Sequence, residues 1–270
     1  MCSTFAGALK HFSPRAILVC LAAHALPGLA FQPLITDDTG TQGTAANQLE
    51  FSYNEDRAKT AVDLVREQTL PFVFTRGLTD SLDIFADTSY SRIRSGSAGQ
   101  NGSGYGNPSI GAKWRFYENE ESKSSLALKP ELIFPVSAGR EDAGLGSGKT
   151  SGNLTAILSQ EVPFGAVHFN ASVGRDRYRD TLSNPDTTTW RASLAPVWDV
   201  SEQWKLALDT GIESARSTAR TTRANYVELG AIYSPTKDLD FALGCIRRSD
   251  NASPHTTTDS VTAGLTWRFK

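Results

Sequence analysis

Two stretches of this chain hold residue types that bind phosphate or catalyse hydrolysis in other proteins. The first, residues 143–150 with the sequence AGLGSGKT, fits a relaxed phosphate-binding loop. Such a loop must leave a buried strand and enter a helix whose N-terminus holds the phosphate. Here a strand is predicted directly after the loop, so we expect no nucleotide site.

The second stretch places His168, Asn170 and Ser172 at alternate positions of one predicted strand. Ser, His and Asn are the residue types that an outer-membrane phospholipase would use. Residues two apart on a strand are separated by about 7 Å, too far for a hydrogen-bonded relay without help from neighbouring strands. They also lie opposite Val167 and Phe169, whereas a lipase must meet lipid. We expect them to line a polar interior, and we predict that the chain is not an enzyme.

The sequence of residues 1–30 is typical of a secretory signal peptide. Lys10 and Arg15 precede the apolar stretch 16–26, and Ala30 fits a signal-peptidase site before Phe31. The stretch is too short to cross a bilayer of about 30 Å as a helix.

Removal of this segment leaves Cys245 as the last cysteine, so no intrachain disulfide and no Cys/His metal pattern is expected. The chain has 27 basic and 29 acidic residues, and the signal peptide takes away two bases and no acid. The remaining mild acidity gives no electrostatic footprint for nucleic acid. We therefore expect no metal, no cofactor and no nucleic-acid partner.

Side chains alternate between apolar and polar in about twelve segments of roughly 9 to 12 residues, the length of a tilted strand that crosses a membrane. The last of them, residues 261–269, ends in Trp267 and Phe269 and is typical of the closing strand of an outer-membrane barrel. The predicted segments are 48–54, 66–75, 82–91, 109–117, 125–136, 153–162, 166–175, 188–200, 204–213, 225–233, 239–247 and 261–269.

Short and long connections alternate between these segments, as they do in barrels with short periplasmic turns and long outer loops. The short ones are 77–80, 163–165, 201–203 and 234–238, and the long ones are 95–108, 139–152, 180–187, 214–224 and 249–259. The fold class is therefore all-β: a transmembrane antiparallel up-and-down β-barrel of about 12 strands in the Gram-negative outer membrane. A secreted soluble β protein is the alternative.

Tryptophan positions favour the membrane barrel over that alternative. Trp114, Trp198, Trp204 and Trp267 lie near the short turns or the C-terminus, and Trp190 lies near the other end of its strand. Indole rings prefer the headgroup level of a bilayer, so this distribution predicts two aromatic girdles.

The polar faces of the strands carry charges of both signs, which suits a narrow or partly blocked lumen held by ion pairs. About twelve strands should give a modest bore. The residues predicted to line it are Asp83, Asp87, Lys113, Arg115, Lys129, Glu131, His168, Arg191, Lys205, Asp209, Glu228 and Arg268.

A short motif after the signal peptide contains Thr36, Asp37, Asp38 and Gly40. With the GLTD turn at 77–80 and the aromatic last strand, it resembles the start of outer-membrane transporters of the MetA-pathway phenol-degradation family. The resemblance implies a barrel that passes hydrophobic or aromatic compounds. Because Asp is a common turn residue, we expect Asp37 and Asp38 at a turn or cap on the periplasmic rim.

The domain boundaries follow from these patterns: residues 31–45 form an N-terminal periplasmic segment, and residues 46–270 form the barrel.

Two functions stay open. One is a passive channel for small hydrophobic or aromatic solutes, and the other is a structural or surface-interaction barrel without transport. The expected partners are outer-membrane lipids, lipopolysaccharide and, through the C-terminal strand, the barrel-assembly machinery.

Overall fold

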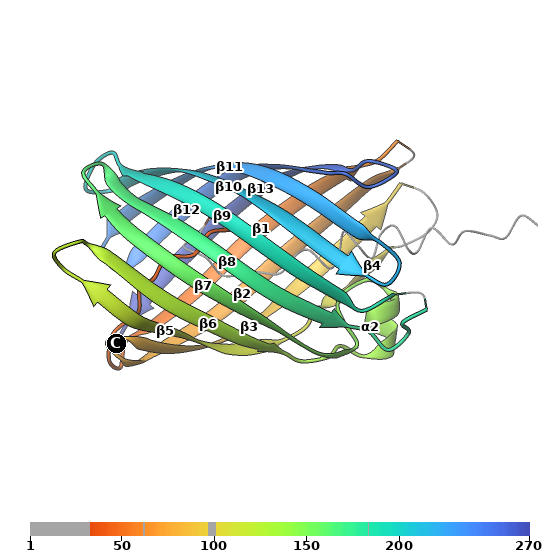
Figure 1. The fold of residues 1–270 in the computed structure, drawn as a ribbon, viewed down its shortest axis with the longest axis horizontal. Coiled ribbons are helices and arrows are strands. Elements are labelled where there is room, and N and C mark those ends of the chain that lie inside the picture. Colours follow the sequence, from red (N-terminus) through yellow and green to blue (C-terminus); the bar gives the residue numbers. More distant parts are fainter. Residues whose placement is uncertain (1–32, 62, 97–100, 183) are drawn as a thin grey trace, which may run out of the picture.

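A closed antiparallel barrel is formed by the residues that the computed structural model describes, which are 33–61, 63–96, 101–182 and 184–270 (Figure 1). Its strands are β1 (Asn47–Lys59), β2 (Leu64–Thr79), β3 (Leu82–Ser95), β4 (Gly102–Tyr105), β5 (Ser109–Asn119), β6 (Ser124–Ile133), β7 (Lys149–Val162), β8 (Gly165–Arg177), β9 (Thr187–Asp199), β10 (Trp204–Ser217), β11 (Thr221–Thr236), β12 (Leu239–Asp250) and β13 (Thr257–Phe269). Within the described ranges, no helix is long and apolar enough to span a membrane. The expected signal peptide lies outside the described residues.

The barrel closes between its first and last strands. β1 pairs with β13 from Asn47 opposite Phe269 to Lys59 opposite Thr257. Every other neighbouring pair is antiparallel, and β3 contacts β5 directly. Twelve strands form the wall and β4 adds a short thirteenth strand on β3, so the predicted fold class is confirmed. β4 lies in the predicted loop 95–108, where Gly and Ser gave no strand signal.

The wall has an apolar outer face and a polar inner face. Along β11, Tyr226 and Glu228 are buried, whereas Val227 and Leu229 between them are exposed. Large exposed apolar side chains recur on the same face of the other strands, as expected for a surface that meets lipid.

Aromatic pairs mark the end of the barrel that carries the short turns. Trp267 lies 4.7 Å from Phe269 between ring centroids, and Trp204 lies 4.8 Å from Tyr233 on the neighbouring strand. Trp198 stacks on Phe164 in the turn between β7 and β8. This arrangement confirms one of the two predicted aromatic girdles.

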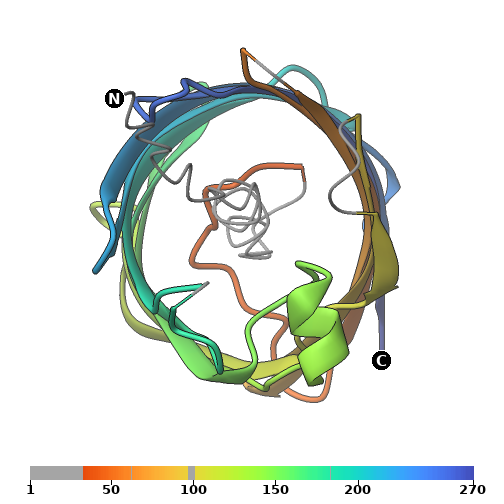
Figure 2. The same cartoon turned by 90° about the vertical axis from the view of Figure 1, so that its right-hand side faces the viewer.

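Two segments enter the barrel. The N-terminal segment, residues 33–46, runs through the lumen before β1 begins (Figure 2). Near the long-loop end, the β6–β7 connection carries the short helix α2 (Ala138–Asp142) and covers one side of the mouth (Figure 2). Its Leu145 packs on Ala58, Val65 and Ile93 of the inner wall. Both segments therefore narrow the bore.

Candidate functional site

The N-terminal segment is held in the lumen by one carboxylate between two ammonium groups. Oδ1 of Asp37 lies 2.9 Å from Nζ of Lys113 on β5, and Oδ2 lies 2.7 Å from Nζ of Lys129 on β6. All three side chains are largely buried. Each half of the carboxylate thus binds a different strand of the wall.

On the opposite wall, Thr36 binds a second carboxylate. Its backbone N–H and its hydroxyl donate to the two oxygens of Asp209 on β10, each over 2.7 Å. The hydroxyl of Tyr226 on β11 donates to the same carboxylate over 2.9 Å. Thr36 and Asp209 are both fully buried, so this contact has no competition from bulk water.

Further along, the segment is tied to the wall down to the short-turn rim. The N–H of Thr39 donates to Ser159 over 3.0 Å, and the N–H of Gln42 donates to Asp83 over 3.0 Å. At the rim, the N–H and hydroxyl of Thr44 both donate to Oδ1 of Asp80. These hydrogen bonds hold the pKa of the Asp80 carboxyl below its usual value.

Glycines on the inner wall leave space for this segment. A Cβ at Gly230 would lie 2.9 Å from Cγ of Pro33, and one at Gly244 would lie 3.0 Å from Cβ of the same proline. Both distances are shorter than ordinary carbon contacts. Next to Pro33, Leu34 packs on an apolar patch of the wall, formed by Ala195, Val197 and Ala207.

The motif that resembled the phenol-degradation family is therefore a lumen anchor. The expected position of Asp37 and Asp38 at the periplasmic rim is wrong for Asp37, which is buried between strands of the wall. Residues 33–42 lie inside the barrel and residues 43–46 lie at its short-turn rim, whereas a separate periplasmic segment was expected for residues 31–45. Asp38 does make a local turn, since its Oδ1 accepts the N–H of Gly40 over 2.6 Å.

Every residue predicted to line the lumen lies on the inner face. Asp83, Lys113, Lys129 and Asp209 contact the N-terminal segment directly. The others contact the wall itself. Asp87 and Glu131 both accept a hydrogen bond from Ser109, His168 is hydrogen-bonded to Ser159 over 2.9 Å, and Arg115 donates to the carbonyl of Asp80 over 3.0 Å. Three ion pairs complete the set: Arg191 with Glu213 at 2.8 Å, Lys205 with Asp199 at 2.8 Å, and Arg268 with Asp240 at 2.6 Å.

Glu228 differs from these residues because neither of its carboxylate oxygens has a hydrogen-bond partner among the described residues. It is fully buried on β11. A Cβ at Gly244 would lie 2.6 Å from its Oε1 and 3.0 Å from Pro33, which places the carboxylate beside the first described residue of the segment.

The two stretches considered for catalysis have structural roles. Residues 143–150 follow α2 as a loop and lead into β7, so no helix N-terminus is present. His168, Asn170 and Ser172 share the inner face of β8. The side-chain amide of Asn170 faces the backbone of Asp37. Its oxygen accepts the N–H of Asp37 over 2.6 Å, and its nitrogen donates to the carbonyl of Asp37 over 2.9 Å.

The space directly beside Asp37 is small. A cavity of about 30 Å³ lies next to Asp37, with Lys129, Glu131 and Arg191 among its lining residues. Such a space holds a water molecule or two. It cannot hold an aromatic ring while the segment is in place.

Sequence reasoning missed the occupant of the lumen, although two signals pointed to it. Lys129 lies opposite Thr155 on β7, so no acid on that strand faces it directly. Gly230 and Gly244 lie opposite each other on the inner face of adjacent strands. A lysine that faces no acid on β7 and two facing glycines on the inner wall together indicate that another part of the chain lies there.

The family model described as "Putative MetA-pathway of phenol degradation" matches residues 33–269. No curated protein matches the chain. Among solved structures, an outer membrane channel from Pseudomonas putida F1 is similar, with 15% identity, a TM-score of 0.71, and coverage of 86% of this chain and 98% of that one.

Two autotransporter domains share the barrel fold. The β domain of Bordetella BrkA has a TM-score of 0.55 at 12% identity, covering 83% of this chain and 100% of its own. The transport unit of AIDA-I from Escherichia coli has a TM-score of 0.55 at 8% identity, covering 96% of this chain and 100% of its own. At these identities, the likeness shows the fold alone.

Proposed function

Because the chain belongs to the MetA-pathway phenol-degradation family, we propose that it is an outer-membrane channel for small hydrophobic or aromatic compounds. The family match and the closed outer-membrane barrel support this class of function. The lumen provides the specific argument, since it is polar on most of its surface but carries an apolar patch near the short-turn end of β9 and β10.

The observation that carries the proposal is how Leu34 is bound. Leu34 covers Ala195, Val197 and Ala207, and the segment that presents it is held by hydrogen bonds and ion pairs. When the segment moves, the patch becomes available to another apolar group. An aromatic solute fits such a place, because small ligands bind chiefly through apolar contact with a few polar groups that fix orientation.

Transport is tested in cells, where the lipopolysaccharide leaflet limits entry of hydrophobic solutes. Initial uptake of labelled phenol is compared among a gene-deletion strain and strains that express the wild type or a variant lacking residues 33–44. We expect the deletion strain to take up phenol more slowly and the shortened barrel to take it up faster than wild type. Equal phenol uptake in all three strains would overturn the proposal, and pentose uptake serves as the control.

We also infer that the chain is exported with cleavage after Ala30 and is inserted by the barrel-assembly machinery through β13. The charge and hydropathy pattern of residues 1–30 supports cleavage, and the terminal pair Trp267 and Phe269 supports recognition of the last strand. N-terminal sequencing of protein from purified outer membranes should begin at Phe31. The proposal assigns no enzymatic activity.

A barrel without transport is the second candidate, and the occupied lumen favours it. With residues 33–46 bound, the cavity beside Asp37 is too small for a solute. In that case the segment would act as a permanent core. A shortened barrel that unfolds, or that remains closed to ions in planar bilayers, would support this second function.

A further inference from the structure

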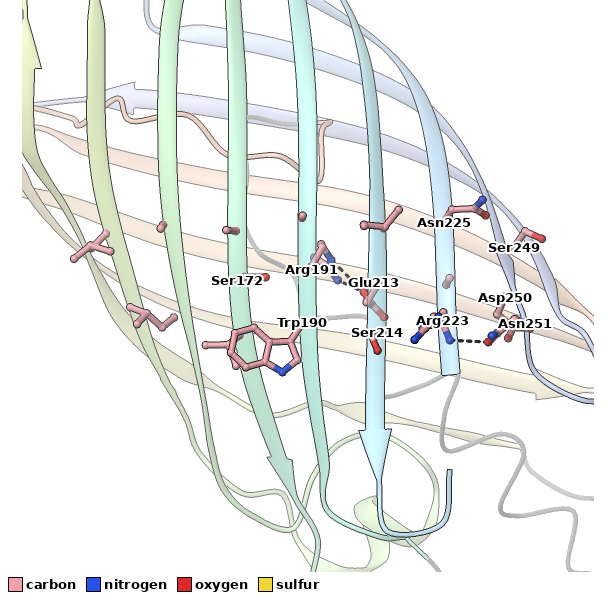
Figure 3. Close-up of a pocket in the computed structure, with 18 residues that line it drawn as sticks. Ser172, Trp190, Arg191, Glu213, Ser214, Arg223, Asn225, Ser249, Asp250 and Asn251 are labelled. Atoms are coloured by element: carbon pink, nitrogen blue, oxygen red, sulfur yellow. Dashed lines mark hydrogen bonds and ion pairs between the residues drawn. The ribbon is translucent and has the colours of Figure 1, made fainter. Parts of the chain in front are cut away.

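A groove of about 880 Å³ lies on the outside of the barrel, across strands β6 to β12 (Figure 3). Trp190 and Ile212 line it and are 60% and 65% exposed. Arg191 and Glu213, which pair with each other on the inner face, line it as well. Because the exposed side chains belong to the outer face, the groove opens toward the lipid.

Small side chains explain the hollow. Ala156, Ala171 and Ala192 lie on three adjacent strands and line the groove together. Larger apolar residues border them, among them Leu154 on β7 and Val173 on β8. From β6 to β10 the groove is thus an apolar depression in a surface that elsewhere carries bulky side chains.

The end of the groove on β11 and β12 is polar. Arg223, Asn225, Ser249, Asp250 and Asn251 line it there (Figure 3). Asp250 lies 3.8 Å from His255, so its carboxylate has a partner of its own. The N–H of Arg223 donates to Oδ1 of Asn251 over 2.7 Å, which fixes the Asn251 side chain at the rim.

Two other arginines at this end of the outer face, Arg247 and Arg175, lie close to acids. Arg247 lies 3.5 Å from Asp259 and Arg175 lies 3.8 Å from Asp186. Within the described part of the chain, no acid lies within ion-pair distance of Arg223 or Arg216. These two are diagonal neighbours, because Arg223 is opposite Ser214 on β10. Two guanidinium groups without acids thus lie beside an apolar groove.

We propose that this groove binds lipopolysaccharide, with acyl chains along β7 to β10 and a lipid A phosphate on Arg223. This end of the barrel carries the longest connections, residues 134–148 between β6 and β7 and residues 178–186 between β8 and β9. Long connections lie on the outer side of such barrels, where lipopolysaccharide forms the leaflet. Guanidinium groups bind phosphate with two parallel hydrogen bonds, and Trp190 is a residue type that favours the headgroup level.

The width of the groove favours lipid A over a phospholipid. From β7 to β11 it crosses four strand spacings, which is about 19 Å. That width accommodates several acyl chains side by side, and lipid A carries more chains than the two of a phospholipid. Its two phosphates also match the pair of arginines.

Binding is measured on purified barrel in phosphatidylcholine nanodiscs, titrated with lipopolysaccharide. Arg223→Ala should weaken binding about tenfold, the size of one lost charge-assisted contact. Arg223→Lys keeps the positive charge but loses the planar guanidinium group, so its affinity should lie between those of Arg223→Ala and the wild type. Ala192→Trp fills the apolar floor and should also weaken binding.

Matched controls lie on the outer face outside the groove. Arg247→Ala on β12, whose guanidinium lies 3.5 Å from Asp259, and Ala86→Trp on β3 change the same residue types at exposed positions, and each should bind like wild type. Unchanged affinity in both Arg223→Ala and Ala192→Trp would overturn the proposal. Equal displacement by phosphatidylglycerol would assign the groove to anionic phospholipid and would also overturn it.

Discussion

The ammonium group of Lys129 lies 2.7 Å from a carboxylate oxygen of Asp37, which joins the middle of β6 to a segment 92 residues earlier in the chain. Lys113 binds the other oxygen from β5. The ladder between β5 and β6 is interrupted at these residues, since no pairing joins Lys113 to Lys129. One aspartate therefore bridges the two strands at a gap in their pairing.

Asp37→Asn should open the barrel. The change leaves two buried ammonium groups without their acid, and breaking such a pair from one side costs about 3 to 5 kcal/mol. We expect a higher single-channel conductance in planar bilayers. Asp38→Asn is the matched control, because the carboxylate of Asp38 lies 3.8 Å from Lys113 and is more exposed than that of Asp37. A similar increase in conductance in that variant would show that the ion pairs of Asp37 do not keep the barrel closed.

Gly230→Leu should expel the segment without altering any charge. Its Cβ would lie 2.9 Å from Pro33 and 3.0 Å from Leu34, and the remaining atoms have no space while the segment is bound. A cysteine introduced at position 34 should then react faster with a water-soluble maleimide. Gly139→Leu has nothing within 4 Å of its Cβ and should leave the labelling rate unchanged.

Glu228→Gln should stabilise the protein. The carboxyl group is buried without a hydrogen-bond partner among the described residues. An amide of the same shape removes the cost of burying a group that is charged in the unfolded chain. We expect a gain of about 1 to 3 kcal/mol in the free energy of unfolding, measured by urea titration in detergent. Glu213→Gln should have the opposite sign, since Glu213 pairs with Arg191 and Arg248. Destabilisation by both changes would contradict the interpretation of Glu228.

Phe269→Asp should prevent insertion. Phe269 lies against Trp267 and is opposite Asn47 where the barrel closes, so a carboxylate there meets lipid and weakens the seam. The amount of heat-modifiable protein in the outer-membrane fraction should fall strongly. Lys270→Asp, which alters the charge one residue later, should insert normally; equal loss would point to terminal charge as the cause.

The wall of this protein could be predicted from local pattern. Each predicted segment falls on a strand because side-chain alternation within one strand already records which face meets lipid. The residues of the inner face could be predicted for the same reason: Asp83 and Asp209, for example, lie on the face that the alternation predicts.

The contents of the lumen could not be predicted in this way. Thr36 binds Asp209 across 173 residues, and residues 33–46 have no periodicity that would reveal such a contact. β4 and α2 are short and lie in a region rich in Gly and Ser, so their positions depend on packing such as that of Leu145 on Ile93.

The attachment of the N-terminal segment to β1 makes it a tethered occupant of its own channel. Residue 46 continues directly into Asn47 at the seam with β13, so a displaced segment stays beside its binding site at an effective concentration on the order of millimolar. Rebinding is then independent of how many barrels the cell makes. The open fraction is set by the strength of a few contacts around Thr36 and Asp37, with about tenfold for each 1.4 kcal/mol, and mutation of this short stretch is enough to tune leakage across the membrane.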